Sequence, residues 1–136
     1  MTDVNTSAFQ ALEDKIAQFR FRLADVPDDV VEDVAKIIDS EQRSTIAAKV
    51  DAYGQPWKAK KVDDGPFTFV KPSDVVTGAI GRTIITRIKT REAVLHHLGY
   101  ARGNVVRRII PVGKIPPKWS ARIKERVLRA FREAAA

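Results

Sequence analysis

The spacing of the apolar residues changes along this chain, and that change limits the fold more than any other feature. Before residue 50, apolar side chains recur every three or four positions, as they do on one face of an α-helix. Segments rich in β-branched residues come later, and helical spacing returns at the C-terminal end. Strands clustered together, with helices outside the cluster, predict an α+β architecture. Between these regions, turn-forming residues fall within nineteen positions, at Gly54, Pro56, Gly65, Pro66 and Pro72.

Two helices are predicted in the N-terminal half. Pro27 separates them, because its ring cannot continue a helix but suits the first turn of a new one. The second helix is expected to run from Pro27 to about residue 49. The first helix, over residues 8–24, carries one apolar stripe made of Phe9, Leu12, Ile16, Phe19 and Leu23.

The middle of the chain predicts a small sheet. It should be mainly antiparallel, because the linkers are too short for repeated crossover helices. Residues 74–78 fit a short helical turn or a connector, and residues 92–98 fit either a helix or a strand. The predicted strands are Phe67–Val70, Arg82–Lys89 and Val105–Ile110.

A C-terminal amphipathic helix is predicted over residues 117–133, where apolar residues recur every four positions at Trp119, Ile123, Val127 and Phe131. At 136 residues, the whole chain is expected to form a single domain, residues 1–136. Its parts are a helical part (8–49), a loop-and-sheet part (51–111) and the C-terminal helix.

The chain contains no cysteine, which excludes disulfides and cysteine metal sites and suits a reducing cytoplasm. No segment reaches the roughly eighteen apolar residues of a membrane span. The polar N-terminus does not resemble a signal peptide. We therefore expect a soluble protein that does not contact a membrane.

The charge is divided unevenly along the chain. Residues 1–50 hold six Lys and Arg against ten Asp and Glu, a net charge of −4. Residues 51–136 hold eighteen against seven, a net charge of +11. Such a division can attract a polyanion, or it can join the acidic face of one copy to the basic face of the next.

Side chains that could carry chemistry are few. His96 and His97 are adjacent and therefore point in different directions, so they are poorly placed to hold one metal ion. No serine lies in a Gly-x-Ser-x-Gly elbow, and no glycine-rich phosphate loop is present. We expect no enzymatic activity, no metal and no cofactor. The carboxylates that begin the second helix are interpreted as solvated groups that favour the helix dipole: Asp28, Asp29, Glu32 and Asp33.

Basic side chains are the remaining candidates for function. Aromatic residues are not interleaved with them as in a platform for single-stranded nucleic acid, and no helix-turn-helix or zinc-finger pattern is present. They are interpreted either as a nonspecific patch that faces phosphate groups or as a plain solvated or subunit-contacting face. The candidates are Lys58, Lys60, Lys61, Arg107, Arg108, Arg122, Arg126 and Arg129.

The most distinctive string is Asp51-x-x-Gly54-x-Pro56-Trp57. Gly54 permits a chain reversal after a helix, Pro56 stiffens the exit, and Trp57 offers a large apolar anchor. A helix stop followed by a core tryptophan would produce the same string in any family.

In its residues and in its position along the chain, that string resembles a loop of the phage virion-morphogenesis family, the Mu G-like tail-completion proteins involved in head–tail joining. The resemblance covers roughly residues 8–133 and includes Thr77-Gly78 before a strand, His97-x-Gly99, and Ile110-Pro111 before the last helix. The chain departs from the family pattern after the His-Gly element: the family usually has Pro-x-Arg there, whereas here arginines precede Pro111.

The resemblance implies a structural virion protein of the neck or tail, made in the host cytoplasm and placed at the head–tail junction. It implies a closed ring of about six or twelve copies around the DNA channel. Its partners would be itself, connector or adaptor proteins and tail-tube proteins, with nonspecific contact to duplex DNA. The resemblance does not distinguish between the roles of tail terminator, completion protein and connector-side adaptor. The alternative is a small nonspecific DNA-binding protein.

Overall fold

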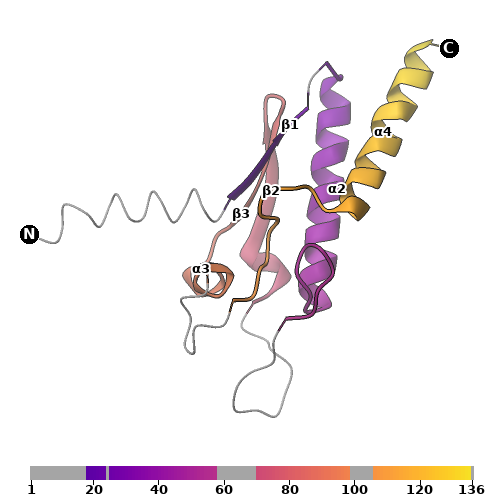
Figure 1. Cartoon of the computed structure of the whole chain (residues 1–136). Helices are drawn as coiled ribbons and strands as arrows, with labels where there is room; N and C mark the ends of the chain where they lie inside the picture. The colour runs from indigo at the N-terminus through magenta and orange to yellow at the C-terminus, as the bar shows by residue number, and fades with distance from the viewer. Residues whose placement is uncertain (1–17, 24, 58–69, 99–105, 136) are drawn as a thin grey trace, which may run out of the picture.

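A computed structural model describes residues 18–23, 25–57, 70–98 and 106–135. The order of elements is β1 (Gln18–Arg22), α2 (Asp28–Ala47), a short 3₁₀ turn (Pro72–Asp74), β2 (Val75–Ile80), β3 (Thr83–Ile88), α3 (Arg91–Leu98) and α4 (Pro117–Ala135). Figure 1 shows α2 lying along the sheet, α4 beside α2, and α3 near the lower end of the sheet. The α+β class predicted from the sequence is therefore confirmed.

The sheet has three antiparallel strands in the order β1-β3-β2. Because side chains alternate along a strand, one face of β3 turns toward α2 and carries the buried Ile84, Thr86 and Ile88. Thr86 lies opposite Phe19 of β1 and Thr77 of β2, and its hydroxyl is 2.8 Å from that of Thr77. This cross-strand pair satisfies the hydroxyl of the buried Thr86 and that of the half-buried Thr77 inside the sheet.

The prediction of a helix over residues 8–24 is wrong where the structure describes that segment, since Gln18–Arg22 form strand β1. Phe19 and Phe21 turn inward, whereas Arg20 and Arg22 turn outward. The same residues therefore fit both an alternating strand and a helical stripe, and hydrogen bonding to β3 favours the strand. Residues 8–17 lie outside the described part, so α2 is the one helix that the described residues place before β2 and β3.

Helix α2 begins one residue later than predicted. Pro27 is its N-cap, and the Pro27 carbonyl accepts the backbone N–H groups of Val30 at 3.0 Å and Val31 at 3.2 Å. The polar stretch of α2 from Ser40 to Thr45 is covered in part by other segments of this chain. Glu41 and Gln42 are only 4% and 1% exposed.

The strand at 82–89 is confirmed as β3, and the ambiguous residues 92–98 belong to α3. Residues 74–78 contain the end of the 3₁₀ turn and the first part of β2. Residues 67–69 of the predicted strand Phe67–Val70 lie outside the described part, and Val70 is a buried residue in a bend.

The predicted strand Val105–Ile110 is wrong over residues 106–110, which belong to no strand. Its β-branched composition suits a strand, but its backbone bonds to α3. The N–H of Arg107 donates to the His96 carbonyl, and the N–H of Ile109 donates to the His97 ring, both at 2.9 Å. These donors are consequently unavailable for a sheet ladder.

The C-terminal helix is confirmed as α4, slightly longer than predicted. Trp119 is 1% exposed and meets Phe19 of β1 edge to face, with ring centroids 6.4 Å apart. Ile123 is also buried, so the first two turns of α4 belong to the same core as α2 and the sheet. Beyond them, α4 leans away from α2 toward its C-terminal end (Figure 1).

Candidate functional site

The Asp51–Trp57 string forms a tight loop that is stabilised by hydrogen bonds between its own residues. One carboxylate oxygen of Asp51 accepts the backbone N–H groups of Tyr53 and Gln55, both at 2.8 Å. Gly54 has φ +92°, a conformation that favours glycine, and its N–H donates to the Asp51 carbonyl at 3.0 Å. The spacing of the motif is therefore the spacing that this turn requires.

A segment that we call the strap, residues 106–116, lies over this loop and leads into α4. The indole Nε1 of Trp57 donates to the Arg108 carbonyl at 2.7 Å. The hydroxyl of Tyr53 donates to the Lys114 carbonyl. From α2, the Gln42 amide donates to the Ile109 carbonyl at 2.6 Å. The loop and α2 thus satisfy strap carbonyls that no strand partner satisfies.

Helix α3 holds the other side of the strap. His97 is fully buried, and its Nδ1 accepts the N–H of Ile109, which places the ring proton on Nε2. Arg108 donates from its guanidinium to the His97 carbonyl at 2.9 Å. Burial, and secondarily the charge of Arg108, lower the pKa of His97 to about 4. His97 is therefore a neutral structural acceptor at neutral pH.

His96 lies beside it and is 6% exposed, so both histidines are buried within this chain. Burial lowers the pKa of His96, and the Arg107 charge acts in the same direction, against an opposing contribution from Glu92. Arg107 is itself 4% exposed and lies 3.1 Å from the His96 ring.

The structure brings most of the motif residues together around the strap. Asp51, Gly54 and Trp57 form the loop beneath it, His97 binds its backbone, and Pro111 is a buried part of it. Pro56, from the same loop, makes a β-bridge with Val50. Thr77 and Gly78 lie apart in β2, and Gly99 lies outside the described part. The contacts of these residues hold the backbone in place. The Nδ1 of His97, which could otherwise act as a base, already accepts the N–H of Ile109.

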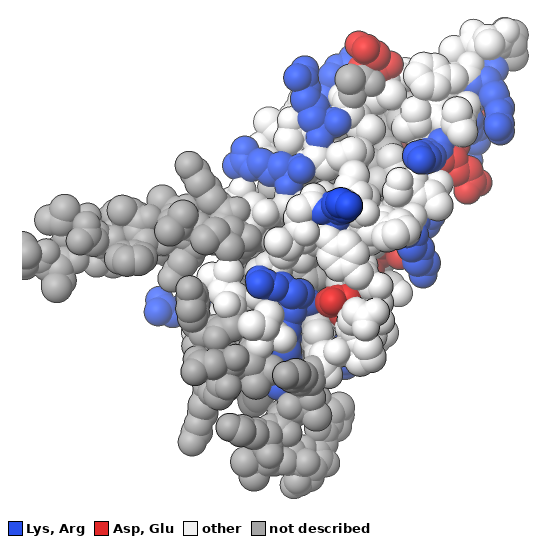
Figure 2. All heavy atoms as spheres, viewed as in Figure 1, with Lys and Arg blue, Asp and Glu red and all other residues white. Residues whose placement is uncertain are grey.

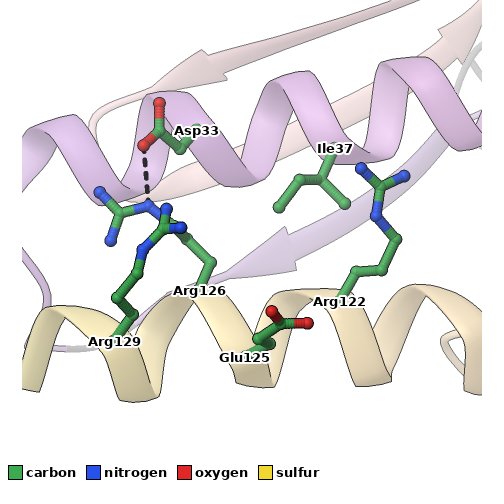
Figure 3. Close-up of a pocket in the computed structure, with 6 residues that line it drawn as sticks. All are labelled: Asp33, Ile37, Arg122, Glu125, Arg126 and Arg129. Atoms are coloured by element: carbon green, nitrogen blue, oxygen red, sulfur yellow. Dashed lines mark hydrogen bonds and ion pairs between the residues drawn. The ribbon is translucent and has the colours of Figure 1, made fainter.

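A second cluster lies between α2 and α4, and we call it the arginine seam. Arg122 donates to Glu41 at 2.6 Å, and Lys118 lies 3.6 Å from the other oxygen of Glu41. Arg126 donates to Asp33 at 2.8 Å (Figure 3), and it also lies 3.8 Å from Asp29. The acidic N-terminal part and the basic C-terminal part therefore meet within one chain, an arrangement that the charge pattern alone did not specify.

Beside the seam is a groove of about 310 Å³ between the two helices. Figure 3 shows Arg122, Arg126 and Arg129 projecting from α4 toward α2, with Ile37 facing them from α2. Arg126 is the most enclosed of the three, with 11% of its side chain exposed. Arg129 forms no ion pair with a described residue, so it keeps its charge available to a ligand or neighbour.

The structure places the eight basic candidates in different parts of the chain, with different contacts. Arg107 and Arg108 hold the strap to α3, and Arg122 and Arg126 hold α4 to α2. Arg129 is exposed and, unlike the other four described members of the set, makes no ion pair or side-chain hydrogen bond with another described residue. The remaining three, Lys58, Lys60 and Lys61, lie outside the described residues.

Large apolar side chains at the surface are a feature that sequence reasoning missed. Phe131 belongs to the apolar repeat predicted for α4, but it is 54% exposed, and Leu128 is 51% exposed. Ile80, at the tip of the β2–β3 hairpin, is 74% exposed. Periodicity identifies the apolar side of a helix, but it does not show how far along the helix its partner extends.

Basic side chains are scattered over the face shown in Figure 2 and do not merge into one continuous patch there. The described residues contain no group of three or more His, Asp or Glu side chains arranged to hold a metal ion. None of the described helices has the length and apolar character of a membrane span.

No protein-family model, no curated protein and no solved structure matches this chain. The resemblance to the phage virion-morphogenesis family therefore depends on the motif residues themselves.

Proposed function

We propose that this protein is a structural subunit of a phage head–tail junction, and that its copies form a ring around the DNA channel. The observation that carries the self-assembly is the exposure of Leu128 and Phe131 on the end of α4. These residues are one helical turn apart and lie close together, so they present a joined apolar surface. Covering such a surface with another protein is favourable, because apolar area leaves water.

The polar clusters support a scaffold and offer little for bond-making chemistry. His97, Trp57 and Gln42 each direct a polar group to strap backbone. The seam carboxylates of Glu41 and Asp33 accept from arginines of the same chain. A nucleophile, base and oxyanion site would need free groups that converge on one cavity, and these groups are committed to the fold.

The place in the virion comes from the motif resemblance. A ring at this position would contact connector or adaptor proteins on one side and tail-tube proteins on the other. Its role would be tail terminator, completion protein or connector-side adaptor. It requires no cofactor, and its channel would face duplex DNA without sequence-specific reading.

A small nonspecific DNA-binding protein is the second candidate, favoured by the net charge of +7. Internal ion pairing of Arg122 and Arg126 weakens that candidate, because it neutralises part of the basic helix. On the face shown in Figure 2, the basic side chains do not form the continuous surface that a groove tracking a phosphate backbone needs.

Size in solution, measured together with duplex binding at low and moderate salt, separates the two. A ring subunit assembles without DNA, alone or with its virion neighbours. A DNA binder stays monomeric or dimeric and binds duplex with a steep dependence on salt. A monomer that binds duplex in this manner, and fails to assemble with its neighbours, would refute the proposal.

A further inference from the structure

The exposed apolar residues of α4 belong to a defined face, which we call the α4 end face: Leu128, Phe131 and Arg132. They occupy helix positions i, i+3 and i+4, so they lie on the same side of the last turns. That side differs from the arginine seam, whose residues turn toward α2 (Figure 3). The α4 end face is therefore apolar at its centre and positive at its edge.

A groove of about 520 Å³ lies between α2 and the turn of the β2–β3 hairpin, and we call it the hairpin groove. Its apolar lining comes from Val31, Ala35 and Ala79. Asp28 and Glu32 line it as exposed acidic residues one helical turn apart. Lys36 also lines it, which leaves the three charged side chains with a net negative charge.

The two surfaces are complementary in chemistry and size. The α4 end face offers two large apolar side chains and a guanidinium, and the hairpin groove offers small apolar residues and a pair of carboxylates. A cavity of about 150 Å³ already accommodates a benzene molecule. The hairpin groove has room for the ring of Phe131 together with Leu128, with Arg132 reaching Asp28 or Glu32.

The two surfaces are also placed so that the α4 end face of one chain does not dock in the hairpin groove of the same chain. In Figure 1, α4 and the β2–β3 hairpin lie on opposite sides of α2, and α4 leans away from α2. A contact between two different surfaces is heterologous, so each copy can use its end face on one neighbour and its groove on the other. Repetition of such a contact produces a ring when the rotation closes.

We propose that the α4 end face of one copy docks in the hairpin groove of the next, and that this contact builds the assembly. The inference rests on the proposed function and names the surfaces through which the copies join. Phe131 inserts against Ala35 and Ala79, and Arg132 pairs with the carboxylates of Asp28 and Glu32.

A charge exchange within the chain tests this contact. Arg132→Glu and Glu32→Arg are each expected to weaken self-association at least tenfold, measured by sedimentation velocity of the full chain. The double variant, Arg132→Glu with Glu32→Arg, restores association, because opposite charges again face each other. Arg87→Glu is the matched control: Arg87 is exposed on the outer face of the sheet, and its charge reversal leaves association unchanged.

A second variant tests the apolar part of the contact. Phe131→Asp is expected to abolish assembly while the thermal melt of the monomer stays close to that of the wild type, because Phe131 is half exposed. A wild-type assembly that persists in Phe131→Asp and in both charge variants would overturn this contact and leave the proposed function standing. A wild-type chain that stays monomeric with its virion neighbours present would overturn both.

Discussion

Lowering the pH from 7.5 to 5 is expected to destabilise this protein through His97. Its ring is fully buried, and its Nδ1 accepts the N–H of Ile109, so protonation would remove that acceptor and place a charge beside Arg108. The pKa of His97 is about 4 in the folded state against 6.5 for an unperturbed histidine. The unfolded chain therefore binds the proton more readily, and stability falls as the pH drops through the window between these values.

The expected size follows from the same two values. At pH 5 most unfolded chains carry the proton on this residue, whereas most folded chains do not. The linkage relation then gives a loss of about 2 kcal/mol at pH 5, relative to pH 7.5. His96 adds to the loss in the same direction, because its pKa is also lowered by burial.

Urea unfolding at pH 7.5, 6 and 5 measures this effect. His97→Asn keeps an oxygen that can accept the N–H of Ile109 but cannot titrate, so its stability should depend less on pH. The variant will be less stable at every pH because it leaves a cavity, and the informative quantity is the slope. His96→Asn is the paired control for the neighbouring ring. Equal slopes for the wild type and His97→Asn would refute the assignment of this loss to His97.

Two further predictions concern the loop and the seam. Gly54→Ala should cost about 1–2 kcal/mol in urea unfolding, because Gly54 has φ +92° and an added Cβ meets open space, so the whole cost is conformational. Gly78→Ala, which also meets open space but at an ordinary φ, should cost nothing, and equal losses at the two positions would contradict this reasoning. Arg122→Met should cost about 2 kcal/mol by leaving the buried Glu41 with a weaker partner, a value reduced because Arg122 is 44% exposed. The exposed partner of Asp39 provides the comparison: Arg43→Met should cost about 0.3–0.5 kcal/mol, and a loss for Arg122→Met no larger than this would show that the seam contributes little.

Strand β3 and helix α4 could be predicted from the sequence because each has one consistent period. Strand β1 could not, since Phe19 fits both a helical stripe and a strand alternation. Its pairing with β3, which lies more than sixty residues away in the chain, decides the outcome. The strap was predicted as a strand for a related reason: its composition favours β structure, but its N–H groups find acceptors on α3.

Among the candidate functional residues, those with local contacts could likewise be recognised from the sequence, and those with long-range contacts could not. The Asp51–Trp57 loop could be recognised because its bonds are local, from Asp51 to residues two and four positions later. The arginine seam could not, because Arg122 and Glu41 are 81 residues apart, and a division of charge along the chain does not say whether the two halves meet within a copy or between copies. The exposure of Phe131 depends on where α2 begins relative to the last turns of α4, which is a tertiary property.

Imaging of the purified assembly by single-particle electron microscopy tests the central claim most directly. The account predicts closed rings with an open centre, formed by this chain alone or with its virion neighbours, in the absence of DNA. Particles that remain single compact subunits under both conditions, and gather only when duplex DNA is added, would contradict it.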